Sequence, residues 1–230
     1  MALEKIRLKH GSPEWQAFRK TGIGGSDAAA ILGLSPFKSN IEVWEEKVGL
    51  REPEDISDKP QVQYGTKAED MLVKLFALDY PQYKVRQDKQ TVYRRGFMFA
   101  SLDGELTEIE TKARGFIEIK TKARGFIEIK TTEIHSAAAL QKWDGHVPEY
   151  YYAQVLHYFV TLGWTFAWLK VQIKQTGRNE QTELITRHYP FLRRALMEDM
   201  KFLYTREKEF WGYVERKQRP PLILPPIYKE

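Results

Sequence analysis

The sequence has 230 residues, of which 42% are hydrophobic and 13% aromatic, enough to bury one sizeable core, so a single domain over residues 1–230 is expected. The excess of Lys and Arg (36) over Asp and Glu (31) permits a polyanionic partner without requiring one. The absence of cysteine excludes disulfides, cysteine-ligated zinc, iron–sulfur clusters and thiol nucleophiles. The five histidines have no HxxxH or HExxH spacing, and no apolar run is long enough for a signal peptide or a membrane span. We therefore expect a soluble, intracellular protein without a histidine-rich zinc site.

Residues 12–50 are predicted to form helices separated by a glycine loop. Ser12 and Pro13 are typical of the N-cap and first position of a helix. The segment GIGGSDAAAILG, residues 22–33, predicts a glycine loop followed by an alanine-rich helix that ends at its last glycine. A further helix is expected over residues 39–49, and the polar, proline-containing residues 51–62 are expected to be a loop.

An amphipathic helix is predicted from Thr66 to Tyr80, where Thr66-x-x-Glu69 matches the capping-box pattern. Residues 83–110 alternate between apolar and polar side chains, which predicts two or three antiparallel strands. The apolar stripe of the helix is expected to consist of Met71, Leu72, Leu75, Phe76 and Leu78.

The decapeptide TKARGFIEIK at residues 111–120 is repeated without change at residues 121–130. Two copies are too few for a solenoid, which needs at least three repeats to bury a core, so a local tandem duplication is the simpler interpretation. The chain therefore offers two candidate Glu-Ile-Lys strands.

The remaining elements are predicted to be two helices, a strand and a long helix. The two helices cover residues 137–143 and 148–162, and the strand covers residues 164–174. The long amphipathic helix runs from about Pro190 to Val214, before a proline-rich tail. This order indicates an α/β (α+β mixed) fold with a central mixed β-sheet flanked by helices.

The Glu-Ile-Lys strand carries the candidate chemistry. In a strand, Glu128 and Lys130 lie on one face and the isoleucines lie on the other. Asp103 precedes a glycine at the end of the neighbouring predicted strand, and carboxylates that converge at strand ends are the hard oxygen ligands that Mg²⁺ prefers. A nearby lysine can act on the attacking water and offset phosphate charge. The alternative is an ordinary ion pair on an exposed strand, because Glu-x-Lys is common there.

Five ordered segments carry a more specific signal: Arg19 with GIGGSDAAAILGLSPF, then YGTKAEDM, SLDG, FIEIKT and WDGHVPEYYYAQVLHYFVTLG. Over roughly residues 13–175 the chain resembles the YqaJ-like viral recombinase family, relatives of phage lambda exonuclease in the PD-(D/E)XK nuclease superfamily. The resemblance implies a restriction-endonuclease-like core and Mg²⁺-dependent, 5′-to-3′ exonuclease activity on double-stranded DNA ends that leaves 3′ single strands. It also implies two metal ions, with Mn²⁺ as a substitute, a single-strand annealing protein as partner, a homo-oligomeric ring, and a place in the cytoplasm of a bacterial host cell.

The resemblance also implies roles for single residues. Asp103, Glu128 and the backbone carbonyl of Ile129 would be metal ligands, and Lys130 would act on the water. Glu69 and Gln154 would be additional catalytic residues. Arg19 and Ser26 would bind the 5′-terminal phosphate of the DNA.

Several of these positions have ordinary structural interpretations that remain open. Glu69 also fits a capping box, and Gln154 fits a polar position on a partly buried helix. The glycine loop could be a tight helix junction; a dinucleotide-binding loop is disfavoured because its third glycine is replaced by Asp27 and no strand is expected before it. The aromatic side chains at Trp143 and residues 150–152 could stack on bases or belong to the core.

The duplication leaves two candidate active-site strands, because Glu118 and Lys120 repeat Glu128 and Lys130 ten residues earlier. Either the hairpin after Asp103 or the later strand-to-helix link must absorb ten extra residues. Loop-closure entropy grows only logarithmically with length, so we predict that the hairpin absorbs them and that the second copy lies at the site. Two other functions stay open: a structure-specific or restriction-like endonuclease, and a DNA-end-binding protein inactivated by the duplication.

Overall fold

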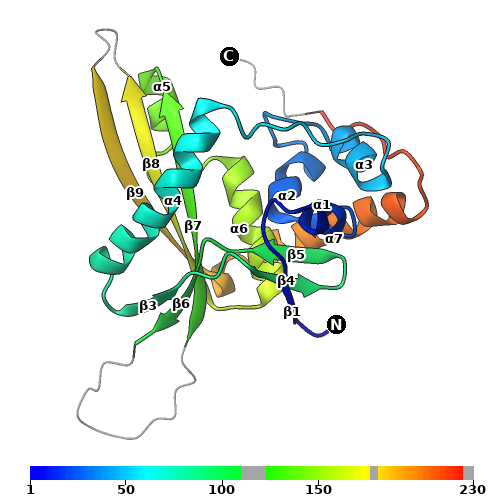
Figure 1. Ribbon diagram of the computed structural model, residues 1–230, viewed down its shortest axis with the longest axis horizontal. Helices are drawn as coiled ribbons and strands as arrows, with labels where there is room; N and C mark the ends of the chain where they lie inside the picture. Colours follow the sequence, from blue (N-terminus) through cyan, green and yellow to red (C-terminus); the bar gives the residue numbers. More distant parts are fainter. Residues whose placement is uncertain (110–122, 177–180, 225–230) are drawn as a thin grey trace, which may run out of the picture.

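The computed structural model describes residues 1–109, 123–176 and 181–224. Within these ranges the strands form two mixed sheets, with orders β1-β4-β5-β2 and β3-β6-β7-β8-β9. Pairing is antiparallel except between β2 and β5 and between β7 and β8, which run parallel. The predicted mixed α/β fold is confirmed, with two sheets in place of one central sheet (Figure 1). The strands are β1 (Glu4–Arg7), β2 (Ile23–Gly24), β3 (Tyr83–Arg86), β4 (Thr91–Arg95), β5 (Met98–Ser101), β6 (Gly104–Glu108), β7 (Arg124–Ile134), β8 (Phe166–Thr176) and β9 (Thr182–Leu192).

Two helices cover the opposite faces of β7, the strand that carries the second Glu-Ile-Lys copy (Figure 1). Ile127 and Ile129 pack with Leu72 and other apolar residues of α4, whereas Phe126 packs against Phe159 of α6. Strand alternation therefore works as the sequence predicts. The helices are α1 (Pro13–Arg19), α2 (Gly25–Ile31), α3 (Asn40–Val48), α4 (Pro60–Asp79), α5 (Ala137–Gln141), α6 (Glu149–Leu162) and α7 (Met197–Glu215), with a 3₁₀ turn at Arg193–Ala195.

The helix boundaries in the first fifty residues follow local signals in the sequence. The Ser12 hydroxyl accepts a hydrogen bond from the Trp15 backbone N–H at 3.2 Å, and Pro13 occupies the first helical position. Ser39 caps α3, and Gly49 ends that helix with a φ of 81°, a backbone conformation that glycine adopts without strain.

The prediction for α4 was wrong in two respects. The helix begins at Pro60, so Thr66 lies inside it and donates a hydrogen bond to the Val62 carbonyl, and no capping box exists there. Its buried face consists of Leu72, Val73 and Phe76, because these side chains meet the five-stranded sheet. The other members of the expected stripe, Met71, Leu75 and Leu78, are exposed.

The strand predictions also needed correction. Residues 83–110 contain four strands, divided between the two sheets, and β2 precedes the alanine-rich helix where no strand was expected. Pro190 lies within β9 instead of at the start of the long helix, which begins at Met197. Proline is tolerated there because β9 is the edge of its sheet and pairs only with β8.

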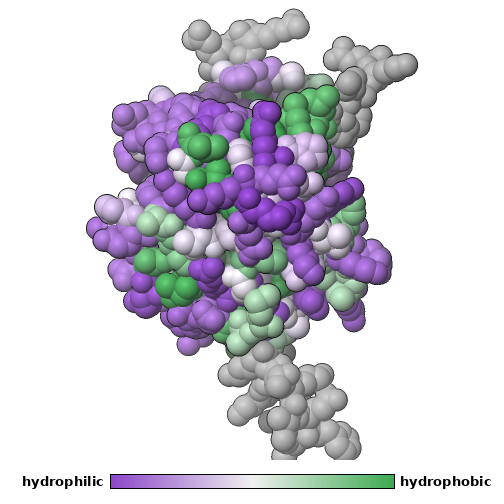
Figure 2. Space-filling model, turned by 90° about the vertical axis from the view of Figure 1, so that its right-hand side faces the viewer, coloured by the Kyte–Doolittle hydropathy of each residue, from purple (hydrophilic) through white to green (hydrophobic). Residues whose placement is uncertain are grey.

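The face seen at the right of Figure 1, which includes α3, is mostly hydrophilic, with separate small hydrophobic patches (Figure 2). In the described part of the chain, no helix combines the length and the apolar character that a membrane crossing requires.

Candidate active site

Asp103 lies in the short connection between β5 and β6, and its carboxylate is fixed by the neighbouring strand. The Ile129 backbone N–H of β7 donates a 2.7 Å hydrogen bond to Asp103 Oδ2. Strand β6 pairs with β7 so that Gly104 faces Ile127. A Cβ at Gly104 would stand 2.9 Å from a methyl carbon of Ile127, so the glycine allows the close approach that brings Asp103 to β7.

Glu128 lies at the centre of the site and is only 3% exposed. Its Oε1 accepts hydrogen bonds from Lys130 Nζ at 2.7 Å and from Gln154 Nε2 of α6 at 2.6 Å. Lys130 also lies over the ring of Tyr151, with its Nζ 5.3 Å from the centroid. The other oxygen of Glu128, Oε2, is buried and has no hydrogen-bond partner among the described residues. A buried carboxylate oxygen without a donor is costly, which indicates a missing positive partner.

The carboxylates of the site repel one another. Burial, together with the charges of Glu128 and Glu69, raises the pKa of Asp103 well above its ordinary value. Burial also raises the pKa of Glu128, although Lys130 opposes the shift. For Lys130 itself, burial would lower the pKa, but the charges of Glu128 and Asp103 outweigh it and raise the pKa. Lys130 is therefore an ammonium ion that offsets part of the negative charge of Glu128 and Asp103.

The carboxylate oxygens of Asp103 and Glu128 are ligands of the kind that a hard divalent cation prefers. One of these oxygens, Glu128 Oε2, is buried without a partner among the described residues. Among the residues that the structure describes, no three Asp, Glu or His side chains are set to hold an ion by themselves. An ion at this site would therefore need a further donor, and the Ile129 carbonyl implied by the family resemblance is adjacent in the chain.

A cavity of about 370 Å³ joins this site to the glycine loop. Its walls contain the carboxylates together with residues of α1 and α2. The predicted site residues that line it are Glu69, Asp103, Glu128, Gln154, Arg19 and Ser26. The structure thus brings six predicted residues, from distant parts of the chain, to one cavity.

The glycine-loop end of the cavity is organised by Asp27, which is fully buried. Its Oδ2 accepts hydrogen bonds from the Gly24 backbone N–H at 3.0 Å and from Lys47 Nζ at 2.7 Å. Lys47 also donates to the Arg19 carbonyl at 2.7 Å, while the Arg19 and Lys38 side chains lie 3.9 Å and 3.8 Å from Asp27 Oδ1. Burial would raise the pKa of Asp27, but these three cations lower it well below its usual range. Asp27 therefore stays ionised and, through Lys47, holds the Arg19 backbone beside the glycine loop.

Sequence reasoning missed further residues of the cavity. His10, Trp15 and Lys89 line it but belong to no motif, so only the tertiary contacts reveal them. Tyr158 also lines it and lies within the last of the five ordered sequence segments, which did not by itself point to this residue. The hydroxyl of Tyr158 donates to the Ser101 carbonyl at 2.8 Å and accepts from Gln154 Nε2 at 3.1 Å.

The predicted aromatic group separates into buried and partly exposed members. Trp143 is only 2% exposed and packs with Tyr151 and Tyr189, so its core interpretation is correct and its ring is inaccessible to bases. Residues 150–152 are partly buried on α6.

The structure brings the second copy of the repeated decapeptide to Asp103, since Glu128, Ile129 and Lys130 belong to β7. Glu118 and Lys120 of the first copy lie outside the described residues. The choice between the copies as the catalytic one therefore stays a prediction.

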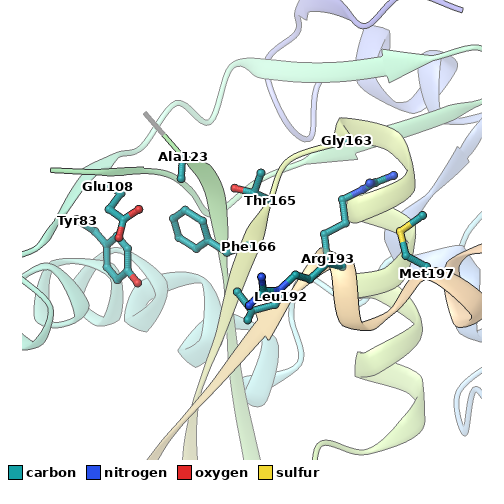
Figure 3. A pocket seen from close by; sticks show the side chains of 10 residues that line it. Tyr83, Glu108, Ala123, Gly163, Thr165, Phe166, Leu192, Arg193 and Met197 are labelled. Carbon is teal, nitrogen blue, oxygen red and sulfur yellow. The ribbon is translucent and has the colours of Figure 1, made fainter. Parts of the chain in front are cut away.

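A second cavity, of about 480 Å³, lies between the ends of β3, β7 and β8 and the start of α7 (Figure 3). Tyr83 and Phe166 face it from the sheet and Arg193 from the 3₁₀ turn. Glu108 is the one carboxylate among its lining residues, so this cavity lacks the paired carboxylates of the first.

Residues 14–165 match the model of the YqaJ-like viral recombinase domain. The chain is 34% identical to the YqaJ protein of Bacillus subtilis over 158 residues, which cover 65% of this chain and 42% of that protein. It thus spans less than half the length of this relative.

Among solved structures, the chain is similar to an alkaline exonuclease, LHK-Exo, from Laribacter hongkongensis. The TM-score is 0.53 at 15% identity, covering 90% of this chain and 94% of that one. The same exonuclease in complex with dAMP gives a TM-score of 0.54 at the same identity and coverage. These structures share the fold. Because the family model covers well over half of the sequence, the chain belongs to the family of the YqaJ-like viral recombinase domain.

Proposed function

We propose that this protein is a Mg²⁺-dependent 5′-to-3′ exonuclease that hydrolyses one strand of double-stranded DNA from its end and leaves a 3′ single strand. The observation that carries the proposal is the single cavity in which Asp103, Glu128 and Glu69 meet Arg19 and Ser26. The carboxylates suit metal-assisted phosphodiester hydrolysis, and the cation and hydroxyl of Arg19 and Ser26 suit a terminal phosphate. Membership of the family and the dAMP bound to an exonuclease of the same fold support the proposal.

In this reaction Asp103, Glu128 and the Ile129 carbonyl would hold the metal ions. Bound Mg²⁺ would supply Lewis-acid stabilisation of the phosphate and make water a better nucleophile. The protein's own groups hold this arrangement in place. The Ile129 N–H orients Asp103, Gln154 orients Glu128, and the Lys130 ammonium is a donor for the attacking water or a phosphate oxygen.

The end preference would come from the residues of α1 and α2 that line the cavity. Arg19 retains hydrogen-bonding capacity for an anion, because its side chain lies 3.9 Å from Asp27 and this single contact is loose. The exposed hydroxyl of Ser26, in the first turn of α2, is a second donor beside it. Together they would bind a 5′-phosphate and place the first phosphodiester at the carboxylates.

The test uses linear duplex DNA with labelled 5′-phosphorylated ends, with and without Mg²⁺, beside closed circular DNA. We expect Mg²⁺-dependent release of nucleotides from the 5′ end and intact circles. Cleaved circles would favour the endonuclease alternative. Binding to ends without release under any metal would favour an end-binding protein.

The duplication provides a matched control for the site itself. Glu128→Gln should lower kcat by at least about 100-fold, because it removes a charge that metal-assisted catalysis requires. Glu118→Gln makes the same change in an identical local sequence and should leave kcat within about two-fold. If Glu118→Gln inactivates the enzyme and Glu128→Gln does not, the first copy is the catalytic one and our assignment is wrong.

The proposal extends to the assembly. We also propose that the protein forms a homo-oligomeric ring and acts with a single-strand annealing protein, and family membership supports both points. Sedimentation of the purified chain tests the ring, and a single species at the monomer mass would contradict it.

A further inference from the structure

Lys89 is the cation of the cavity that no motif indicates. It lies in the connection between β3 and β4, and its Nζ is 3.2 Å from Glu69 Oε1 and 2.6 Å from Asp70 Oδ1. Its side chain is 46% exposed. Lys130, by contrast, belongs to strand β7, has a largely buried side chain and lies against the ring of Tyr151. Lys89 is therefore the lysine of the cavity that can change partners at small cost.

The contact with Lys89 decides what Glu69 can bind. Glu69 lies close enough to Asp103 and Glu128 for its charge to raise the pKa of both. Nevertheless its Oε1 faces the Lys89 ammonium, and within the described ranges no three carboxylates stand together as an ion site. A divalent cation that approached Glu69 would meet the positive charge of Lys89 at about the same place.

Lys89 also has a second partner ready. Asp70, the next residue on α4, makes the shorter of its two contacts and is itself 47% exposed. Gln87 donates to the same Asp70 oxygen at 3.3 Å and to the Asp103 carbonyl at 3.4 Å, so this connection is tied to the site. An ammonium released from Glu69 would stay at the mouth of the cavity, held by Asp70, where a DNA phosphate would pass.

We propose that Lys89 is an exchangeable counter-ion: in the free protein it pairs with both Glu69 and Asp70, and when a divalent cation binds beside Glu69 it leaves Glu69, keeps Asp70 and turns to a DNA phosphate. The proposal deepens the exonuclease function and rests on it for the identity of the phosphate. Its consequence is that the free protein binds the cation weakly at Glu69 and that DNA relieves this competition. Lys89 is thus a positioning residue, which acts through Glu69.

The direct test is Mg²⁺ binding to the protein without DNA, measured by isothermal titration calorimetry, which requires no activity. Lys89→Gln should tighten Mg²⁺ binding by about five-fold, the size expected from losing one partly exposed ion pair. Lys89→Arg keeps the charge and should bind Mg²⁺ as the parent does. Lys74→Gln removes the same charge from an exposed position one turn beyond Asp70 on α4 and should leave Mg²⁺ binding unchanged.

A second arm measures DNA-end affinity by fluorescence anisotropy in the presence of Mg²⁺, with a duplex whose end carries phosphorothioate linkages that resist hydrolysis. Lys89→Gln should weaken binding and lower the slope of log affinity against log salt by about one, the loss of one phosphate contact. Unchanged or weaker Mg²⁺ binding in Lys89→Gln overturns the proposal, and so does an equal gain in Lys74→Gln. Failure of the exonuclease function would appear separately, as absent nucleotide release by the parent protein.

Discussion

Removal of one copy of the repeated decapeptide should stabilise the protein. Glu108 and Ala123 close the β6–β7 hairpin through a 3.1 Å backbone hydrogen bond, and residues 109–122 lie between them. Deleting residues 113–122 leaves four residues there in place of fourteen, a usual hairpin length, and yields the same protein whichever copy is considered lost. The loop-closure relation, (3/2)RT ln(14/4), gives a gain of about 1 kcal/mol in the free energy of unfolding.

The gain is measured by urea unfolding, followed by the fluorescence of the six tryptophans, and corresponds to a Tm about 2–4 °C higher. Nuclease activity should be retained, because the deletion leaves every described contact of Asp103, Glu128 and Lys130 in place. As a control, ten Gly and Ser residues in place of residues 113–122 keep the length and should give no gain. A deletion variant that is less stable than the parent, or inactive, would refute the assignment of the extra residues to the hairpin.

Three further predictions concern buried groups. The two ring nitrogens of His157 lie 2.8 Å from a carboxylate oxygen of α7 and 3.0 Å from a backbone carbonyl oxygen of β5, an arrangement that favours the imidazolium. Burial would lower its pKa, but this carboxylate raises it above 6.5, so its contribution to stability is complete below pH 6.5 and is lost as pH rises through the folded pKa. His157→Gln should flatten that fall in urea unfolding measured from pH 6 to 9, and an unchanged slope would contradict it. Asp27→Ala leaves the buried Lys47 without its carboxylate and should reduce the free energy of unfolding by about 3–5 kcal/mol, whereas a loss below about 1 kcal/mol would show that the pair is dispensable. Gly25→Ala places a methyl group 2.5 Å from a ring carbon of Tyr158, so it should lower kcat more than about ten-fold. The far-ultraviolet circular dichroism should stay unchanged, and full activity would contradict the tight packing.

The elements that local chemistry specifies were predictable from the sequence. The start of α1 at Ser12 and Pro13 and the end of α3 at Gly49 depend on residues within one turn of each boundary. The alternation in β7 predicted that the isoleucines lie on the opposite face from Glu128 and Lys130, because strand geometry has a period of two residues. It did not predict which helix covers each face. Local pattern failed at Pro190, since an edge strand and a helix start both tolerate proline and only the sheet order distinguishes them.

The sequence by itself determined the chemical types at the candidate site: Asp103 before a glycine, a Glu-Ile-Lys strand, and a glycine loop with Arg19 before it. It could not determine that Asp103, Glu128 and Arg19 line one cavity, because that depends on the pairing of β6 with β7 and on the packing of α6 against β7. Only the tertiary structure showed Lys89 beside Glu69 and Asp27 among three cations. Such contacts join residues far apart in sequence, and their energies depend on burial and distance, which no local pattern encodes.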